Sequence, residues 1–371
     1  MRQPRIALIG SLALALALTA AAPFAGCAPD QESVDIENSA IGVMQTRGTE
    51  ETSRIVFYDE NLEKTRALSL AYATFGGPFY NPLVSQGRLY AIPQGLYDRK
   101  DGNKAVAIDL ASLAVEEYPI EQPGMNSIAT NDVYIWTCNT FNRESFLNRC
   151  RMEDGEVESL SIPEEFIMSI LWHEDSLYAF AKSMTTNDVS VYRYDIDFNL
   201  VSHVDIADRN LSVYRTAAHE GLIYFCGLGA DESAGYAGKI GVFDTQANTV
   251  GTIDLDGKYP SSIAFHDGRL FVSHYDPFQG SETESPFSVI DLETGAVDRY
   301  ELGHPVEQIV IRDDSLFVLG GTVLYRYRAA DMQLEESTDI EMMPGDFSYL
   351  SGLFAMPESG KRTEGPTQAG A

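Results

Sequence analysis

The chain has 371 residues and is strongly acidic, with 55 aspartates and glutamates against 26 lysines and arginines and a formal net charge of −29. A protein this negative should repel nucleic acid and anionic lipid headgroups, so we expect no nucleic-acid partner. No stretch after residue 26 is long and apolar enough to span a bilayer, so the only membrane attachment that we expect is at the N-terminus.

Residues 1–26 have the pattern of an export signal rather than of a domain helix. Arg2 and Arg5 give a basic start, residues 6–22 form a continuous run of apolar and small residues, and small residues precede Cys27. Removal of this segment, which holds two arginines and no acidic residue, takes the formal charge from −29 to −31.

The sequence Phe24-Ala25-Gly26-Cys27 resembles the lipobox of bacterial lipoproteins, with Phe24 where that family usually has leucine. In that family the cysteine thiol is acylated and the residue becomes the new N-terminus. The resemblance implies a palmitate-carrying protein, lipidated at Cys27, on the outer face of the bacterial cell membrane or elsewhere in the envelope or periplasm. The alternative is an ordinary signal peptide followed by an unremarkable cysteine. Residues 27–39 are polar and acidic after the cysteine and are predicted to form a flexible tether.

The segment from Ser261 to Leu302 shows the unit that organises the rest of the chain. It contains four short runs of apolar or alternating residues, and His266-Asp267-Gly268-Arg269 joins the first two runs. Aspartate-glycine between alternating apolar runs is among the strongest local signals for a β-hairpin. The unit is therefore predicted to be four short antiparallel strands.

The same unit recurs along nearly the whole chain, with a period of about 45 residues. One mark of the period is the apolar residue that opens the second strand of a unit, at Leu89, Val133, Leu177, Ile223, Leu270 and Leu316. A second mark, the apolar end of the fourth strand, gives a count of seven units between Leu70 and Ile340. Such sheets stack around an axis because none can bury both faces alone. We therefore predict an all-β, seven-bladed β-propeller of four-stranded antiparallel blades over residues 40–358.

Both ends of the chain are predicted to share one blade. The N-terminal part supplies RIVFYDENL and KTRALSL, the outer two strands of a unit that lacks its first strand. The C-terminal FSYLSGLFAMP, residues 347–357, repeats the first strand and the start of a second, and such sharing would remove the exposed edge of an open ring. Either AIGVMQT, residues 40–46, or GLFAM is the second strand of that blade. Residues 359–371 are polar and are predicted to be a disordered tail.

Two stretches, residues 242–255 (VFDTQANTVGTIDL) and 288–302 (SVIDLETGAVDRYEL), resemble the YVTN-type repeats of bacterial surface propellers, a WD40-like or quinoprotein-like kind. In those repeats the third strand ends in aspartate, and a short turn leads to the fourth strand. Aspartate takes this place in five of the seven units, at Asp59, Asp109, Asp195, Asp244 and Asp291. The resemblance implies the fold and carries no activity with it.

Three cysteines follow Cys27 in the sequence. Cys138 and Cys150 lie on what are predicted to be adjacent strands of one hairpin, and outside the cytoplasm two cysteines so placed are expected to form a disulfide. Two free thiols are the alternative, because the geometry of a cross-strand disulfide is demanding. Cys226 lies in the predicted strand IYFC and is expected to be buried and inert.

No motif indicates a catalytic centre, a metal site or a cofactor, and we expect none of these. His173, His219 and His266 recur at one place in the repeat, but they belong to different units, and a turn position explains them better than a metal ring. The acidic residues lack the spacing of an EF-hand. A Gly-x-Ser-x-Gly elbow, a His-Glu-x-x-His motif and a glycine-rich phosphate loop are all missing from the sequence.

The candidate ligand-binding residues are predicted at the mouth of the central channel. Connections into the first strand of each unit share this face with the loops between second and third strands, and long loops on a rigid scaffold suit recognition. Phe347 lies in the last such connection. The predicted residues of the connections are Tyr80, Asn126, Phe166, Arg209, Asn210, Lys258, Tyr259, His304 and Glu307, and those of the long loops are Tyr97, Tyr236 and Tyr275. The alternative is that many of these aromatic residues only fill the channel and wedge between blades.

The favoured hypothesis is a non-catalytic, lipid-anchored propeller that binds or scaffolds a protein or glycan ligand at the cell envelope. The alternative is a propeller enzyme of lactonase or lyase type, with a site assembled from several blades. His304 with Glu307 and Arg209 would be its acid–base set. A quinoprotein-like or sensor domain ranks last because the sequence has no Cys-x-x-Cys-His haem attachment. The sequence fixes neither the ligand nor the oligomeric state.

Overall fold

The computed structural model describes residues 36–77, 82–94, 103–122, 125–209, 211–227, 238–276 and 286–357. The predicted export signal, Cys27 and the predicted tail at 359–371 lie outside these ranges. Within them the chain forms 28 strands and one short 3-10 helix, η1 (Ile36–Asn38). No helix of the described ranges has the length and apolar character needed to cross a membrane.

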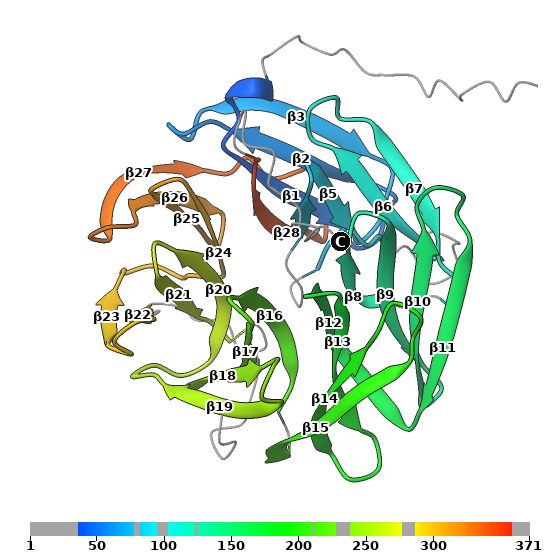
Figure 1. The fold of residues 1–371 in the computed structure, drawn as a ribbon. Helices are drawn as coiled ribbons and strands as arrows, with labels where there is room; N and C mark the ends of the chain where they lie inside the picture. The colour runs from blue at the N-terminus through cyan, green and yellow to red at the C-terminus, as the bar shows by residue number, and fades with distance from the viewer. Residues whose placement is uncertain are drawn as a thin grey trace, which may run out of the picture. The chain divides into compact units, whose positions relative to one another are not determined.

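Six four-stranded antiparallel sheets are built from strands that follow one another in the chain, with the first strand innermost (Figure 1). The first three of them are β4 (Leu83–Ser85), β5 (Arg88–Ala91), β6 (Lys104–Asp109) and β7 (Val115–Pro119); β8 (Met125–Thr130), β9 (Tyr134–Phe141), β10 (Glu144–Arg151) and β11 (Val157–Pro163); and β12 (Glu165–His173), β13 (Ser176–Ser183), β14 (Asp188–Tyr194) and β15 (Leu200–Arg209). The other three are β16 (Val213–His219), β17 (Leu222–Gly227), β18 (Lys239–Asp244) and β19 (Thr249–Asp254); β20 (Pro260–His266), β21 (Arg269–His274), β22 (Pro286–Asp291) and β23 (Val297–Glu301); and β24 (Gln308–Arg312), β25 (Ser315–Gly320), β26 (Val323–Arg328) and β27 (Gln333–Asp339).

The remaining sheet joins the two ends of the chain, which confirms the predicted shared blade. Its order is β28-β1-β2-β3, from β28 (Ser348–Ala355) through β1 (Ile41–Arg47) and β2 (Ser53–Tyr58) to β3 (Lys64–Leu70). The segment AIGVMQT is therefore the second strand. The prediction that the C-terminal segment contains parts of two strands is wrong, because the whole of β28 pairs with β1, with one irregularity at Ser351.

The packed part of the chain begins before residue 40. Ile36 of η1 packs against the core between the β28-β1-β2-β3 sheet and the β4–β7 sheet. Ser39 Oγ lies 2.7 Å from Thr65 Oγ1. The end of the segment predicted as a tether is thus part of the fold.

Seven hydrophobic cores lie between neighbouring sheets in the described part of the chain, so each sheet buries both of its faces. Alternation along β5 sends Leu89 to the core shared with β1–β3 and Tyr90 to the core shared with β8–β11. On the other face of the sheet that joins the chain ends, Val43 of β1 and Phe317 of β25 belong to one core, which closes the ring. The protein is a seven-bladed β-propeller, as predicted.

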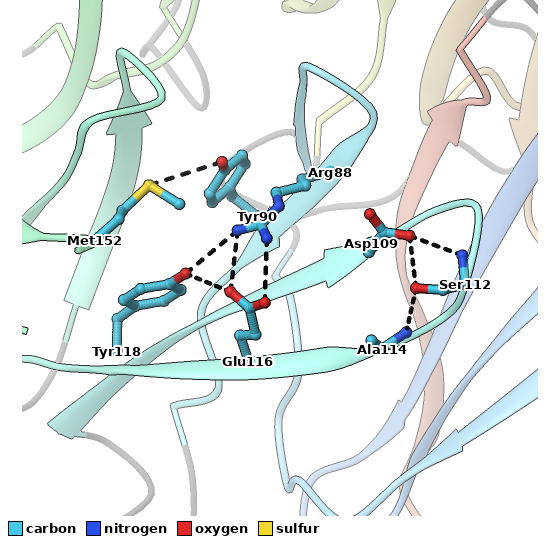
Figure 2. Close-up of polar contacts among 8 residues, drawn as sticks. All are labelled: Arg88, Tyr90, Asp109, Ser112, Ala114, Glu116, Tyr118 and Met152. Atoms are coloured by element: carbon cyan, nitrogen blue, oxygen red, sulfur yellow. Dashed lines mark hydrogen bonds and ion pairs between the residues drawn. The ribbon is translucent and has the colours of Figure 1, made fainter. Parts of the chain in front are cut away.

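Aspartate at the end of the third strand shapes the turn to the fourth. Asp109 Oδ1 accepts hydrogen bonds of 2.7 Å from both the backbone N–H and the hydroxyl of Ser112 (Figure 2). These bonds lower the pKa of Asp109. Equivalent bonds from backbone N–H groups two to four residues further on reach Asp59, Asp195, Asp244 and Asp291. The five repeated aspartates therefore stabilise turns.

The turn between the first and second strands of a blade also agrees with the Asp-Gly signal in the sequence. Asp267 and Gly268 have φ values of 48° and 68°, the left-handed backbone that a two-residue hairpin of this type requires. His266 pairs with Arg269 across this turn. His173 and His219 hold the same position before their own turns.

Five innermost strands carry one extra residue relative to their neighbour, at the same place in each strand. The extra residues are Asn126, Met168, Tyr214, Ser261 and Ser351. A β-bulge bends its strand and redirects a side chain. The bulges therefore turn one side chain away from the regular alternation in each of these five blades.

Side chains of one innermost strand hydrogen-bond the backbone of the next. Asn126 Nδ2 donates to Ile167 O at 3.1 Å, and Ser127 Oγ accepts from Ile170 N at 3.2 Å. An innermost strand has a strand partner on one side only, so such bonds satisfy backbone groups on its other edge. Since Asn126 and Ser127 meet β12 in the same chain order, β8 and β12 run in the same direction.

The predicted disulfide between Cys138 and Cys150 is wrong. The residues lie on adjacent strands, but the register pairs Cys138 with Leu147 and Cys150 with Ile135. Three residues of strand separate the two positions, roughly 10 Å, which exceeds the reach of a disulfide. The side chains also belong to different cores, on opposite faces of the sheet. Both thiols are free and buried.

Burial also keeps the thiols unreactive. It raises the pKa of Cys138 to about 12 and that of Cys150 to about 11. Cys226 is buried as predicted, and burial raises its pKa to about 12. A thiol with so high a pKa holds little thiolate near neutral pH.

We expect Gly42→Ala to destabilise the seam between the chain ends. The ring of Phe354 on β28 lies over Gly42 and meets Phe57 edge-to-face at 6.2 Å, so a methyl group at residue 42 would collide with it. Overpacking of this kind typically costs about 1–3 kcal/mol. Chemical denaturation should show this loss, while Gly251→Ala on β19, where an added methyl group meets nothing within 4 Å, should change stability little. Equal stability of the two variants would contradict the packing described here.

Candidate ligand-binding site

The connections into the innermost strands and the turns between second and third strands meet at one end of each sheet. Pro260, which begins β20, pairs with His274, which ends β21. Glu165 and Ser183 pair in the same way in the β12–β15 sheet. Because the innermost strands β8 and β12 run in the same direction, these ends fall on one side of the ring, which we call the loop face.

Part of the predicted site lies outside the described residues. This holds for Tyr80, Tyr97, Asn210 and Tyr236, and for the side chain of Arg209. The described members are Asn126, Phe166, Lys258, Tyr259, Tyr275, His304 and Glu307. Their role in ligand binding stays a prediction, and their contacts are as follows.

Lys258, Tyr259 and Tyr275 come together around the buried side chain of His274. Tyr275 N donates to Tyr259 O at 2.9 Å, and His274 Nδ1 lies 2.9 Å from Lys258 O. Tyr259 has a φ of 57°, a left-handed backbone that is uncommon for a residue other than glycine. Burial and then the carboxylate of Glu307 raise the pKa of Tyr275, which places Glu307 in the same neighbourhood. The structure therefore brings four predicted residues together where the β20–β23 blade meets the β24–β27 blade.

His304 is held between two tyrosines of its own blade. Its ring stacks on Tyr325 with centroids 3.6 Å apart, Nε2 lies 2.5 Å from Tyr327 Oη, and Nδ1 lies 2.8 Å from Pro305 O. Burial lowers the pKa of His304. Glu307, whose pKa is raised by burial, accepts a backbone N–H of the β25–β26 turn at 3.0 Å. Each member of the predicted acid–base pair is thus engaged in contacts within the β24–β27 blade.

Asn126 and Phe166 contact neighbouring blades. The amide of Asn126 bonds β12, as described above. Phe166 packs against the core between the β12–β15 and β16–β19 sheets. The packing of Phe166 matches the alternative considered for the aromatic residues, that they wedge between blades.

A cavity of about 310 Å³, here called the inner cavity, lies among the innermost strands β4, β8, β12 and β16. Its volume is at the lower end of the range for small-molecule sites. Apolar residues make up most of the wall, and Arg215 is the only charged residue among the described residues that line it. The polar and aromatic lining includes Ser127, Ser169, Trp172, Tyr214, Arg215 and Thr216.

Aromatic stacking holds one part of the cavity wall in place. Trp172 stacks on Trp136 with ring centroids 4.4 Å apart and 9° between the planes, and these are the two tryptophans of the chain. Tyr214 is the extra residue of β16, and burial raises its pKa. Rigid aromatic walls of this kind suit a ligand with an apolar body.

Reasoning from the sequence missed Trp172, Tyr214 and Arg215. A signal was nevertheless present, because aligning the innermost strands gives NSIA, MSIL, YRTA and SSIA. The second residue of these segments is serine in three blades and arginine in β16. A departure from a repeat at a position next to the channel is the feature that could have indicated a site.

Arg88, Glu116 and Tyr118 form a charged network on the β4–β7 blade (Figure 2). Arg88 Nη1 and Nη2 lie 3.0 and 3.1 Å from the two carboxylate oxygens of Glu116, and Tyr118 Oη donates to Glu116 at 2.5 Å. The hydrogen bond from Tyr118 and then Arg88 lower the pKa of Glu116. This bidentate ion pair joins β5 to β7, and its two charges neutralise each other. Its role is therefore structural. Within the described residues, no three histidine, cysteine or acidic side chains are placed to share a metal ion.

No protein-family profile matches the chain, and no curated protein matches it in sequence. Solved structures match its fold. The dihydro-heme d1 dehydrogenase NirN in complex with DHE aligns with a TM-score of 0.56 and 12% identity over 83% of this chain, which spans 65% of the length of the NirN chain. A functionally unknown protein from Desulfotomaculum acetoxidans aligns with a TM-score of 0.58 and 11% identity, over 85% of this chain and 98% of its own. Apo AztD from Citrobacter koseri aligns with a TM-score of 0.51 and 10% identity, over 86% and 98%. At these identities the likeness shows the β-propeller fold alone.

We expect acid to destabilise the loop face through His274. This side chain is 2% exposed, its Nε2 lies 2.8 Å from Ser288 Oγ, and burial lowers its pKa from 6.5 to about 4. The unfolded chain therefore binds the proton first, so stability that is complete above pH 6.5 is lost as the pH falls to 4. The difference amounts to about 3 kcal/mol.

Denaturation curves between pH 7 and 4 would test this expectation. His274→Gln should lose less stability over this range than the wild type. Parallel curves for the two proteins would show that His274 does not control the acid response.

Proposed function

We propose that the protein is a lipid-anchored, extracytoplasmic β-propeller that binds a protein or glycan partner at the bacterial cell envelope and catalyses no reaction. The observation that carries the proposal is the exposure of aromatic residues on the loop face. Phe347, directly before β28, is 73% exposed, and Phe141, at the end of β9, is 56% exposed. Large exposed aromatic side chains gain binding free energy when a partner covers them.

The backbone at Phe347 also supports a binding role. Its φ of 59° is in the left-handed region, which costs free energy for a residue with a bulky side chain. Strained residues persist where the surrounding structure holds them, and they concentrate at functional sites. A ring of rigid blades supplies that support.

The lipid anchor rests on the resemblance of Phe24-Ala25-Gly26-Cys27 to a lipobox and on the export signal before it. The resemblance of the repeats to YVTN-type surface propellers supports the same location. The strongly negative charge disfavours direct contact with anionic headgroups, so the acyl chains would hold the protein while the propeller faces outward.

Binding is favoured over catalysis because His304 and Glu307 are engaged in packing contacts and hydrogen bonds within their own blade. Among the structural neighbours, NirN was solved in complex with DHE, which supports a ligand-holding role for propellers of this shape. That support extends to the scaffold and not to the reaction of NirN.

The anchor predicts a simple fractionation result. Cys27→Ser should move the protein from the detergent-extracted membrane fraction to the soluble fraction and abolish incorporation of radiolabelled palmitate, because the thiol that carries the lipid is gone. Cys226→Ser, which removes a buried thiol, is the matched control and should stay membrane-bound and labelled. A Cys27→Ser protein that remains in the membrane fraction would refute the anchor.

Binding is tested by cross-linking and pull-down from intact cells, with the full-length protein as bait. A variant with both Phe141→Ser and Phe347→Ser should recover at least tenfold less of the partner, as expected when interface aromatic residues are lost. Leu334→Ser, at an exposed residue of the outer strand β27, should recover as much as the wild type. Recovery of no protein or envelope glycan by the wild type would contradict the proposed function.

A further inference from the structure

In four of the five innermost strands with an extra residue, the residue after it is small, and one blade departs from this rule. In β8, β12 and β20 the residue after the extra one is serine, at Ser127, Ser169 and Ser262. In β28 the small residue is Gly352. In β16 the same position holds Arg215. These five positions are equivalent in register, so the comparison concerns one place in the repeat.

Serine at this position serves contacts between blades. Ser127 Oγ accepts from Ile170 N at 3.2 Å, and Ser262 Oγ accepts from Ile309 N at 3.3 Å. Ser169 Oγ lies 3.3 Å from a threonine hydroxyl on β16. A small hydroxyl is thus sufficient for packing of the ring, and the fold alone does not require an arginine here.

Arg215 places a positive charge in the wall of the inner cavity. It is 3% exposed and also interacts with other residues of the chain. Burial of a guanidinium is costly unless it is compensated, so a cation in place of the serine used elsewhere calls for a reason.

We propose that the inner cavity binds a small organic carboxylate, with the carboxylate at Arg215 and the apolar body against Trp172 and Tyr214. The planar guanidinium presents paired donors that match a carboxylate, and the interaction is strong where water is excluded. The apolar lining and the volume of about 310 Å³ fit a ligand of few atoms with one flat or apolar group. The proposal depends neither on the lipid anchor nor on the loop face.

The test compares benzoate, its neutral isostere benzamide and inorganic phosphate, titrated into the full-length protein by calorimetry. The wild type should bind benzoate at least tenfold more tightly than benzamide or phosphate. In Arg215→Ser, which restores the residue found in three other blades, benzoate should bind no better than benzamide while the melting temperature is retained. Arg143→Ser, at an exposed arginine of the β9–β10 turn, is the matched control and should bind as the wild type does.

Tryptophan emission gives a second readout, because Trp172 lines the cavity and the chain has two tryptophans. Benzoate should change the emission of the wild type and not that of Arg215→Ser. If Arg215→Ser fails to fold, Arg215→Lys takes its place, because lysine keeps the charge but not the paired donors. Arg215→Lys should lower the affinity for benzoate and leave the affinity for benzamide unchanged.

Three results would overturn the proposal. These are failure of the wild type to bind benzoate, equal affinity for benzoate and benzamide, and undiminished benzoate binding by a folded Arg215→Ser protein. Phosphate binding as tight as that of benzoate would overturn the assignment of an apolar ligand body. None of these results bears on membrane attachment or on the partner of the loop face.

Discussion

Each blade of the propeller shares one hydrophobic core with the blade before it and a second core with the blade after it. Alternate residues of one strand therefore serve different interfaces, as Leu89 and Tyr90 do in β5. No blade is complete without both neighbours, so the ring must close for all seven to bury their apolar surfaces fully. The pairing of β28 with β1 supplies that closure, and the ring of Phe354 lying over Gly42 fixes it by contact.

The architecture could be predicted because its signals are local and repeated. Asp-Gly turns and the capping aspartates act within a few residues, as Asp109 does with Ser112. The register of paired strands, which decides which residues lie opposite each other, is not set by local signals of this kind. Cys138 and Cys150 lie on adjacent strands as expected, but which residues face each other depends on a ladder whose offset no local motif reveals.

The candidate sites were harder to predict because their residues come from separate blades. Trp172 of β12 and Arg215 of β16 line one cavity because the ring brings their strands together, and a bulge shifts the alternation within both strands. His304 shows the opposite error. A histidine in a connection suggests chemistry, whereas its stacking on Tyr325 becomes visible only once the two segments of the blade are paired.

The joining of the two chain ends also fixes when the molecule can finish folding. The N–H of Met343 bonds the side chain of Gln45 across 298 positions, and β28 is the last strand to be synthesised while its partner β1 is the first. Until Ser348–Ala355 has left the ribosome, β1 keeps one unpaired edge. The apolar surface that β28 covers then stays exposed to water. A nascent or prematurely released chain is therefore an open arc with an unpaired strand edge and exposed apolar surface. Chaperones and proteases act on species of this kind.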